Sequence, residues 1–123
     1  MTRNKYRVAS PEDRQFMGRT YASKAEMLYA VELYRMRDAG LIIDYVEQPR
    51  TWLGVPENKY VPDFLVIPRD SVPYYVDVKG IETAAFKKNK RLWAAYGYLQ
   101  LYLVKRKGKG FEVYEIVEGA DGG

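Results

Sequence analysis

The feature that most constrains the fold is a pair of apolar segments joined by a short turn. Residues 60–67 and 74–79 are rich in β-branched and aromatic residues, and the turn between them contains two prolines. This pattern predicts two β-strands joined as a hairpin. Each strand carries one aspartate, Asp63 in the first and Asp77 in the second. Burying an unpaired charge is costly, so both carboxylates are expected to have hydrogen-bond partners, ion-pair partners or a bound metal.

The relative position of the two aspartates depends on the register of this hairpin. Successive side chains of a strand point to opposite faces, so Asp77 and Lys79 share one face. One register places Asp63 beside Asp77, whereas a slip of one residue places the two on opposite faces. The sequence leaves both registers open.

Two helices are predicted, one before the hairpin and one after it. Apolar residues recur at helical spacing in residues 24–39, between the candidate N-cap Ser23 and the candidate terminating residue Gly40. Thr83 is a candidate N-cap for a second helix, which Gly97 ends. The apolar pattern of both segments predicts that each helix packs one side against the sheet.

The remaining strands complete an α/β domain. They are expected at residues 41–47 with a continuation at 50–53, at residues 99–104 and at residues 111–117. The order α-β-β-β-α-β-β favours a mixed β-sheet flanked by helices. A chain of 123 residues suits one domain. We expect this domain at residues 21–118, a basic and partly ordered N-terminal arm at residues 1–20, and a flexible tail at residues 119–123.

The composition excludes several classes of enzyme. The chain has neither cysteine nor histidine, which rules out thiol nucleophiles, thiolate zinc sites, Ser-His-Asp catalysis and nucleases built on a catalytic histidine. A metal bound by this chain must have oxygen ligands, which Mg²⁺ and Mn²⁺ prefer. No apolar run is long enough to cross a bilayer, and no apolar signal core follows the basic N-terminus. A cytoplasmic protein with no membrane partner is therefore expected.

Charge is distributed unevenly along the chain, whose net charge is +4. Residues 83–110 contain no acidic residue, whereas residues 26–82 are net acidic. Basic segments on either side of an acidic centre suit a protein that holds a polyanion around a carboxylate site. An ordinary solvated surface explains the same pattern equally well.

Asp63, Asp77 and Lys79 together suit phosphodiester hydrolysis. Two carboxylates can hold a divalent ion that polarises a phosphate and lowers the pKa of a bound water. The lysine can position or deprotonate that water, or stabilise charge on the phosphate. Considered alone, Asp77 and Lys79 are more simply explained as a surface ion pair. The preceding Pro-Asp inside an apolar strand favours the catalytic interpretation.

The sequence Pro62-Asp63, followed by Asp77-Val78-Lys79 on the next strand, resembles the signature of the PD-(D/E)XK nuclease superfamily. The likeness is closer to small phage endonucleases and Holliday-junction resolvases. Their Ser-(Lys/Arg)-x-Glu, Pro-Asp-Phe and acid-x-Lys-Gly motifs are similar to residues 23–26, 62–64 and 77–80. The resemblance spans residues 21–117 and implies a restriction-endonuclease-like core. Asp77 stands where many relatives carry glutamate, and the signature permits either residue.

The resemblance implies a metal-dependent endodeoxyribonuclease and a set of site residues. Its catalytic residues would be Glu26, Asp63, Asp77 and Lys79. Its Mg²⁺ or Mn²⁺ ligands would be Glu26, Asp63, Asp77 and the backbone carbonyl of Val78. The Ser-x-x-Glu pattern is also a capping box, in which Glu26 reaches back to the cap amide. Glu32, on the same helix, is the second candidate for this carboxylate.

The resemblance also implies substrates and partners. It predicts cleavage of four-way or branched DNA junctions that leaves a 5′-phosphate, as in DNA recombination, by a homodimer that makes paired cuts. For a phage-encoded enzyme the location would be the host cell cytoplasm. A less selective DNA nuclease, associated with restriction or transposition, is an alternative. A non-catalytic DNA-binding module on the same fold is another.

Basic residues on the second helix are candidate phosphate contacts. Lys87, Lys90 and Arg91 are spaced by three and four residues, so they can line one side of the helix. Such contacts position DNA without reading its sequence. Lys24, at the start of the first helix, is a further candidate. A solvated helix face explains these residues equally well.

Overall fold

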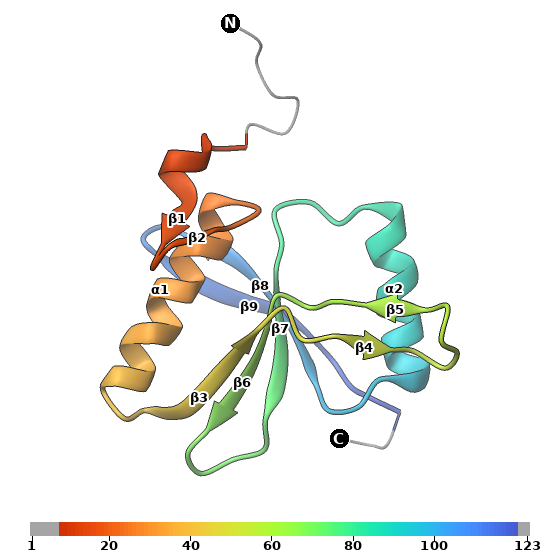
Figure 1. Ribbon diagram of the computed structural model, residues 1–123. Coiled ribbons are helices and arrows are strands. Elements are labelled where there is room, and N and C mark those ends of the chain that lie inside the picture. Colours follow the sequence, from red (N-terminus) through yellow and green to blue (C-terminus); the bar gives the residue numbers. More distant parts are fainter. Residues whose placement is uncertain (1–7, 121–123) are drawn as a thin grey trace, which may run out of the picture.

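The computed structural model describes residues 8–120 and is built around one five-stranded sheet (Figure 1). Two neighbouring strands of this sheet, β7 (Tyr74–Val78) and β8 (Leu101–Lys107), are parallel, and the other neighbouring strands are antiparallel. The predicted α/β class, with a mixed sheet and two helices, is confirmed. In spatial order, the strands are β3 (Ile42–Glu47), β6 (Phe64–Pro68), β7 (Tyr74–Val78), β8 (Leu101–Lys107) and β9 (Gly110–Val117).

Two helices flank the sheet, α1 (Lys24–Asp38) and α2 (Ala84–Tyr96), and both begin and end where the sequence predicts. The side-chain oxygens of Ser23 and Thr83 each accept, at 3.1 Å, the backbone N–H three residues farther along. Gly40 follows α1 with a φ of +77°, a conformation that glycine adopts without strain. Gly97 ends α2 and donates its N–H to the Trp93 carbonyl.

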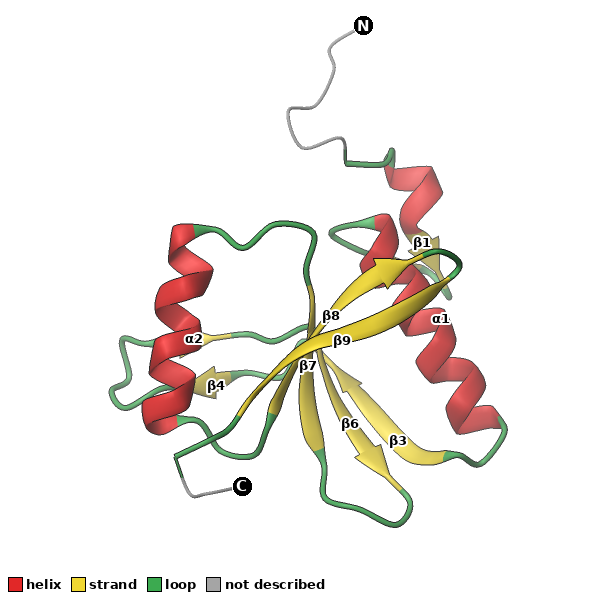
Figure 2. Ribbon diagram, turned by 180° about the vertical axis from the view of Figure 1, so that it is seen from behind, coloured by secondary structure: helices red, strands yellow, loops and turns green. Residues whose placement is uncertain are grey.

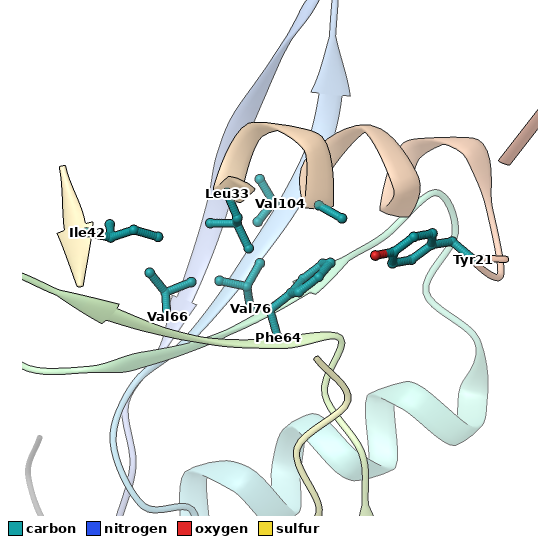
Figure 3. Packing of buried hydrophobic residues seen from close by; sticks show 8 residues of the cluster. Tyr21, Leu33, Ile42, Phe64, Val66, Val76 and Val104 are labelled. Atoms are coloured by element: carbon teal, nitrogen blue, oxygen red, sulfur yellow. The ribbon is translucent and has the colours of Figure 1, made fainter. Parts of the chain in front are cut away.

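α1 covers one face of the sheet through a hydrophobic cluster (Figure 3). Leu33 of α1 packs there with Phe64, Val66 and Val76 of the central strands. Figure 2 shows that the long β8–β9 hairpin crosses the back of the molecule toward α1. Through this cluster, a single helix packs against strands from distant parts of the sequence.

Strand side chains alternate between the two faces of the sheet, so the opposite face is also apolar. α2 covers this face through a second hydrophobic cluster. Trp93 is fully buried at its centre and packs with Leu101 and Leu103 of β8. The indole N–H of Trp93 donates to the Leu99 carbonyl at 3.1 Å. The apolar surface of Trp93 is thus packed against other side chains, and its one polar group has a hydrogen-bond partner.

Between β3 and β6 the chain makes an excursion toward α2 (Figures 1 and 2). Its two short strands, β4 (Thr51–Trp52) and β5 (Lys59–Tyr60), form a separate antiparallel pair. The prediction that residues 50–53 continue the first strand is therefore wrong. Gln48, with a φ of +51°, turns the chain away at the end of β3. The strand predicted at residues 60–67 is likewise divided, since residues 61–63 belong to neither β5 nor β6.

The predicted N-terminal arm is described from residue 8 onward, and residues 1–7 lie outside the described part. It contains a 3-10 turn, η1 (Pro11–Arg14), and a hairpin of β1 (Gln15–Phe16) and β2 (Arg19–Thr20). The Phe16 ring meets Tyr34 of α1 edge-on, with 5.5 Å between centroids. Of the predicted tail, residues 121–123 lie outside the described part. Within residues 8–120, no helix is both long and apolar enough to pass through a membrane.

Candidate active site

Asp63 and Asp77 lie next to each other where β6 and β7 meet the excursion. The register pairs Phe64 with Val76, so Asp63 and Asp77 follow as the next pair of opposite residues. The Asp63 backbone N–H donates to Asp77 Oδ1 at 2.9 Å, and the Val78 N–H donates to Asp63 Oδ2 at 2.8 Å. Of the two registers that the sequence leaves open, the structure has the one that places Asp63 beside Asp77.

Asp77 is only 2% exposed, yet both of its carboxylate oxygens have partners. Oδ2 accepts a hydrogen bond from the Tyr60 hydroxyl and lies 3.4 Å from Lys79 Nζ. Burial raises the pKa of Asp77, and the Lys79 charge and the Asp63 N–H act in the opposite direction. The carboxylate is therefore hydrogen-bonded and ion-paired, as expected for an acid inside an apolar strand.

Lys79 is held between the sheet and α2. Its Nζ lies 3.9 Å from the centroid of the Phe86 ring, on the first turn of α2, as well as near Asp77. The ring face attracts the ammonium group, so the contact adds to the ion pair. Lys79 therefore has a fixed position beside the two aspartates.

Glu26 lies in the first turn of α1 and is 5% exposed. Burial raises the pKa of Glu26 to about 8, and the neighbouring Asp63 carboxyl acts in the same direction through a hydrogen bond and its charge. The Ala22 backbone N–H, which hydrogen-bonds to the Glu26 carboxylate, lowers the same pKa. Glu26 therefore contacts both the start of its helix and Asp63. The second candidate, Glu32, is exposed and pairs with Arg35 at 3.8 Å.

Glu26 should make the free energy of unfolding fall as the pH rises. Its carboxyl has an ordinary pKa of 4.5 and a folded-state pKa of about 8, so the folded state binds the proton more tightly. The resulting stabilisation is complete below pH 4.5 and is lost as the pH rises through 8. Denaturant unfolding in buffers with chelator, from acid to alkaline pH, should show a loss of a few kcal/mol for the wild type. Glu26→Gln should show a much flatter profile, and identical profiles would contradict the assignment.

Tyr60 is a site residue that sequence analysis did not identify. Its hydroxyl donates to Asp77, and its ring meets Trp93 nearly edge-on with 5.9 Å between centroids. The contact exists because the excursion returns through β5 over α2. In the sequence, Tyr60 stands out only as part of an apolar run, and such a position predicts packing in the core and not a hydrogen bond to a carboxylate.

Replacing Tyr60 with phenylalanine should weaken the site without removing its packing. Loss of one buried hydrogen bond should lower stability by about 1 kcal/mol. Groups that orient metal ligands typically contribute about 10- to 100-fold in metal affinity or activity, so the Mg²⁺ dependence of thermal stabilisation, which reports metal binding at the cluster, should shift by this amount. Tyr75→Phe is the matched control, because the Tyr75 ring also packs on Trp93. Equal Mg²⁺ dependence in the two variants would count against a role for the Tyr60 hydroxyl.

The basic residues predicted on α2 differ in their surroundings. Lys90 Nζ lies 2.9 Å from both Glu82 and Glu115, so two carboxylates balance its charge and it links α2 to β9. Glu82 also accepts the Tyr114 hydroxyl at 2.6 Å. These contacts lower the pKa of Glu82, with the Tyr114 hydrogen bond as the largest cause. Lys90 is therefore fixed on the protein surface by its own chain.

The other predicted DNA contacts are more accessible. Lys87 and Arg91 are exposed one turn apart on α2, and Lys24 is exposed at the start of α1. None of the three forms an ion pair with residues 8–120. Their charges are therefore available to a phosphate backbone.

The donor chemistry of the cluster fits a hard divalent cation. Glu26, Asp63 and Asp77 offer only oxygen atoms, which Mg²⁺ and Mn²⁺ prefer. Within the described residues, however, no three Asp, Glu, His or Cys side chains are already arranged as a metal-binding group. Asp77 Oδ1 accepts one hydrogen bond, from the Asp63 N–H, and keeps a second lone pair for a cation, whereas Oδ2 faces both Tyr60 and Lys79. The pKa of Glu26 is raised first by burial and then by the neighbouring Asp63 carboxyl.

No protein-family model matches the chain, and no curated protein matches it either.

Proposed function

We propose that the protein is a metal-dependent endodeoxyribonuclease of the PD-(D/E)XK type, with a restriction-endonuclease-like core. The proposal depends on one observation above all: Asp63, Asp77 and Lys79 converge with Glu26 although they come from three separate segments. A surface ion pair does not account for this arrangement, because Asp77 is buried. Functional sites are where burial and neighbouring charges are often arranged to shift pKa values, and the buried acids beside Lys79 match that pattern.

Each residue of the cluster would have a separate role in phosphodiester hydrolysis. Glu26, Asp63, Asp77 and the Val78 carbonyl would hold Mg²⁺ or Mn²⁺, which supplies a polarised phosphate and a water of lowered pKa. Lys79 would donate a hydrogen bond to a phosphate oxygen and stabilise its charge as the bond breaks. The contact with Phe86 holds the ammonium group in place for this role. The expected product carries a 5′-phosphate.

The proposed substrate is a four-way or branched DNA junction, cut by a homodimer. The decisive experiment compares Mg²⁺-dependent cleavage of a labelled four-way junction with cleavage of a linear duplex of the same sequence. Two symmetric nicks confined to the junction would support a Holliday-junction resolvase. Equal digestion of both substrates would support a less selective nuclease, and binding without cutting in Mg²⁺ or Mn²⁺ would indicate a DNA-binding module.

The exposed cations of α2 give a prediction for binding alone. Lys87→Ala combined with Arg91→Ala should weaken DNA binding and reduce its dependence on salt. Each lost phosphate contact lowers the slope of log K against log salt by about 0.9, so the double variant should lose about 2. The slope is measured by fluorescence anisotropy over a salt series in chelator. Arg35→Ala combined with Arg69→Ala removes the same charge elsewhere and should leave the slope unchanged. An unaltered slope in the α2 variant would exclude phosphate contacts for that pair.

A further inference from the structure

A cavity of about 370 Å³ lies between α1, β3 and the β1–β2 hairpin. Aromatic rings form much of its wall, and one methionine, two arginines and one glutamate complete it. Its volume falls in the range of sites that bind small organic ligands. None of the proposed catalytic residues lines it. The cavity is therefore a second feature, which the proposed chemistry does not use.

The aromatic wall of the cavity is fixed in position by one arginine. The Arg37 guanidinium lies over the Tyr34 ring of α1 at 5.6 Å and over the Tyr45 ring of β3 at 4.8 Å. Arg37 is itself held by Asp44 at 3.0 Å. Both rings are half-buried and the guanidinium covers one face of each, so a planar ligand would stack on the opposite face. Rings held in this way offer a stacking surface for a planar ligand at little cost in side-chain entropy.

Glu47 supplies the polar group of the cavity, and its orientation is fixed. Its Oε2 accepts the Tyr21 hydroxyl at 2.8 Å and lies 3.0 Å from Arg19 Nε. Its Oε1 receives no hydrogen bond or ion pair from residues 8–120. One carboxylate oxygen is therefore left to accept a hydrogen bond from a ligand. The exocyclic amino groups of cytosine and adenine are donors of the kind that a carboxylate accepts.

The cavity adjoins both segments that carry the carboxylate cluster. Glu47 ends β3, and the next residue, Gln48, donates its N–H to the Asp63 carbonyl at 2.8 Å. Tyr21, buried under the start of α1 (Figure 3), is two residues before the N-cap of the helix that carries Glu26. A nucleic-acid strand held at the carboxylate cluster would therefore pass close to the cavity.

We propose that this cavity binds one unpaired nucleobase of the DNA, stacked against Tyr34 and Tyr45, with Glu47 Oε1 accepting its amino group. The proposal rests on the proposed nuclease function and adds a basis for selecting branched DNA. A base inside a duplex is stacked on both sides and must leave the helix to enter a pocket. Bases near a branch or in a single-stranded tail meet this requirement at lower energy. Substrates with unpaired bases would thus be preferred.

The test uses a DNA duplex with a short single-stranded tail that contains one 2-aminopurine, a fluorescent base, in buffer with chelator so that no cleavage occurs. Binding to the wild type should quench the fluorescence by stacking. Tyr34→Leu combined with Tyr45→Leu keeps apolar bulk but removes both rings, and it should abolish quenching and lower the affinity about tenfold. Tyr98→Leu, which changes an exposed tyrosine outside the cavity, should match the wild type. Quenching that persists in the double variant would overturn the proposal.

A second variant tests the polar contact without disturbing the packing. In Glu47→Gln, Tyr21 and Arg19 hold the amide oxygen at the Oε2 position, so the NH₂ group takes the place of Oε1. This turns an acceptor into a donor. Wild type should bind tails with cytosine or adenine at the tested position about tenfold more tightly than tails with thymine, and the variant should lose or reverse this preference. An unchanged base preference would overturn the proposal even if the tyrosine double variant failed to fold.

Cleavage of the four-way junction in Mg²⁺ is measured separately, so that the two proposals can fail independently. Base-dependent binding by a wild type that cuts nothing would refute the nuclease function and support the cavity proposal. Cleavage together with binding that ignores both the tail base and the tyrosine variants would support the nuclease and refute the cavity proposal.

Discussion

Replacing Asp77 with asparagine should abolish DNA cleavage and leave DNA binding close to that of the wild type. Asparagine has the same shape but no charge, so the cluster loses a ligand for the cation and Lys79 loses its ion pair. Removal of one group that stabilises charge in a transition state commonly costs about 10²- to 10³-fold in rate. Loss of a metal ligand should cost at least as much. The measurement is the single-turnover rate on a labelled four-way junction in Mg²⁺, with binding followed by anisotropy in chelator.

Asp70→Asn is the matched control for this experiment. Asp70 is exposed in the turn between β6 and β7, on the same hairpin as Asp77, and its replacement should change neither cutting nor binding. Cleavage at the wild-type rate by Asp77→Asn would remove Asp77 from the mechanism. A loss of binding together with cleavage would show that Asp77 acts through the structure instead of the chemistry.

Replacing Trp93 with alanine should cause the largest loss of stability of any single change considered. Trp93 is fully buried, packs on Tyr60 and Tyr75, and donates its indole N–H to the Leu99 carbonyl. Truncation of a buried aromatic side chain costs about 3–5 kcal/mol. That is a large fraction of the roughly 5–15 kcal/mol that separates folded from unfolded domains. Urea unfolding followed by circular dichroism measures the difference.

The same substitution should also disturb the candidate active site through Tyr60, whose ring packs on Trp93 and whose hydroxyl contacts Asp77. Trp52→Ala is the control, since Trp52 is 54% exposed, and surface substitutions usually change stability by no more than about 0.5 kcal/mol. A loss below 1 kcal/mol for Trp93→Ala would contradict the central place of Trp93 in the cluster under α2.

Local signals in the sequence predicted the parts of the fold that depend on local chemistry. Ser23 and Thr83 are N-caps because their oxygens meet backbone N–H groups within one turn of the chain. Gly40 ends α1 because its positive φ suits a residue without a side chain. These features depend on a few neighbouring residues, so the sequence pattern is sufficient to locate them.

The excursion between β3 and β6 was not predictable in the same way. Residues 50–53 and 60–67 both have strand-forming composition, and nothing in their pattern shows that β4 and β5 pair with each other. That pairing is stabilised by packing of Leu53 and Tyr60 on α2, which is distant in sequence. Tertiary contacts of this kind override local strand propensity.

The candidate site was predictable in its acids and its lysine, and less so in their contacts. Asp63 and Asp77 stood out because charged residues are rare inside apolar strands. Their shared register needed the structure, because both registers satisfy the strand pattern. The ion pairs of Lys90 could not be predicted from the distribution of charge along the chain, since its partners Glu82 and Glu115 are 8 and 25 residues away.

The two hydrophobic clusters lie on opposite faces of the sheet, and the carboxylates of the candidate active site have contacts from both. Glu26 belongs to the helix over one face, whereas the Asp77 carboxylate is held by Tyr60 from the cluster over the other. Domains open locally, in units that need less free energy than complete unfolding. Detachment of α1 would carry Glu26 away from Asp63, and detachment of the β4–β5 excursion would remove Tyr60 from Asp77. Heat should therefore abolish the proposed cleavage at a temperature below the calorimetric melting transition.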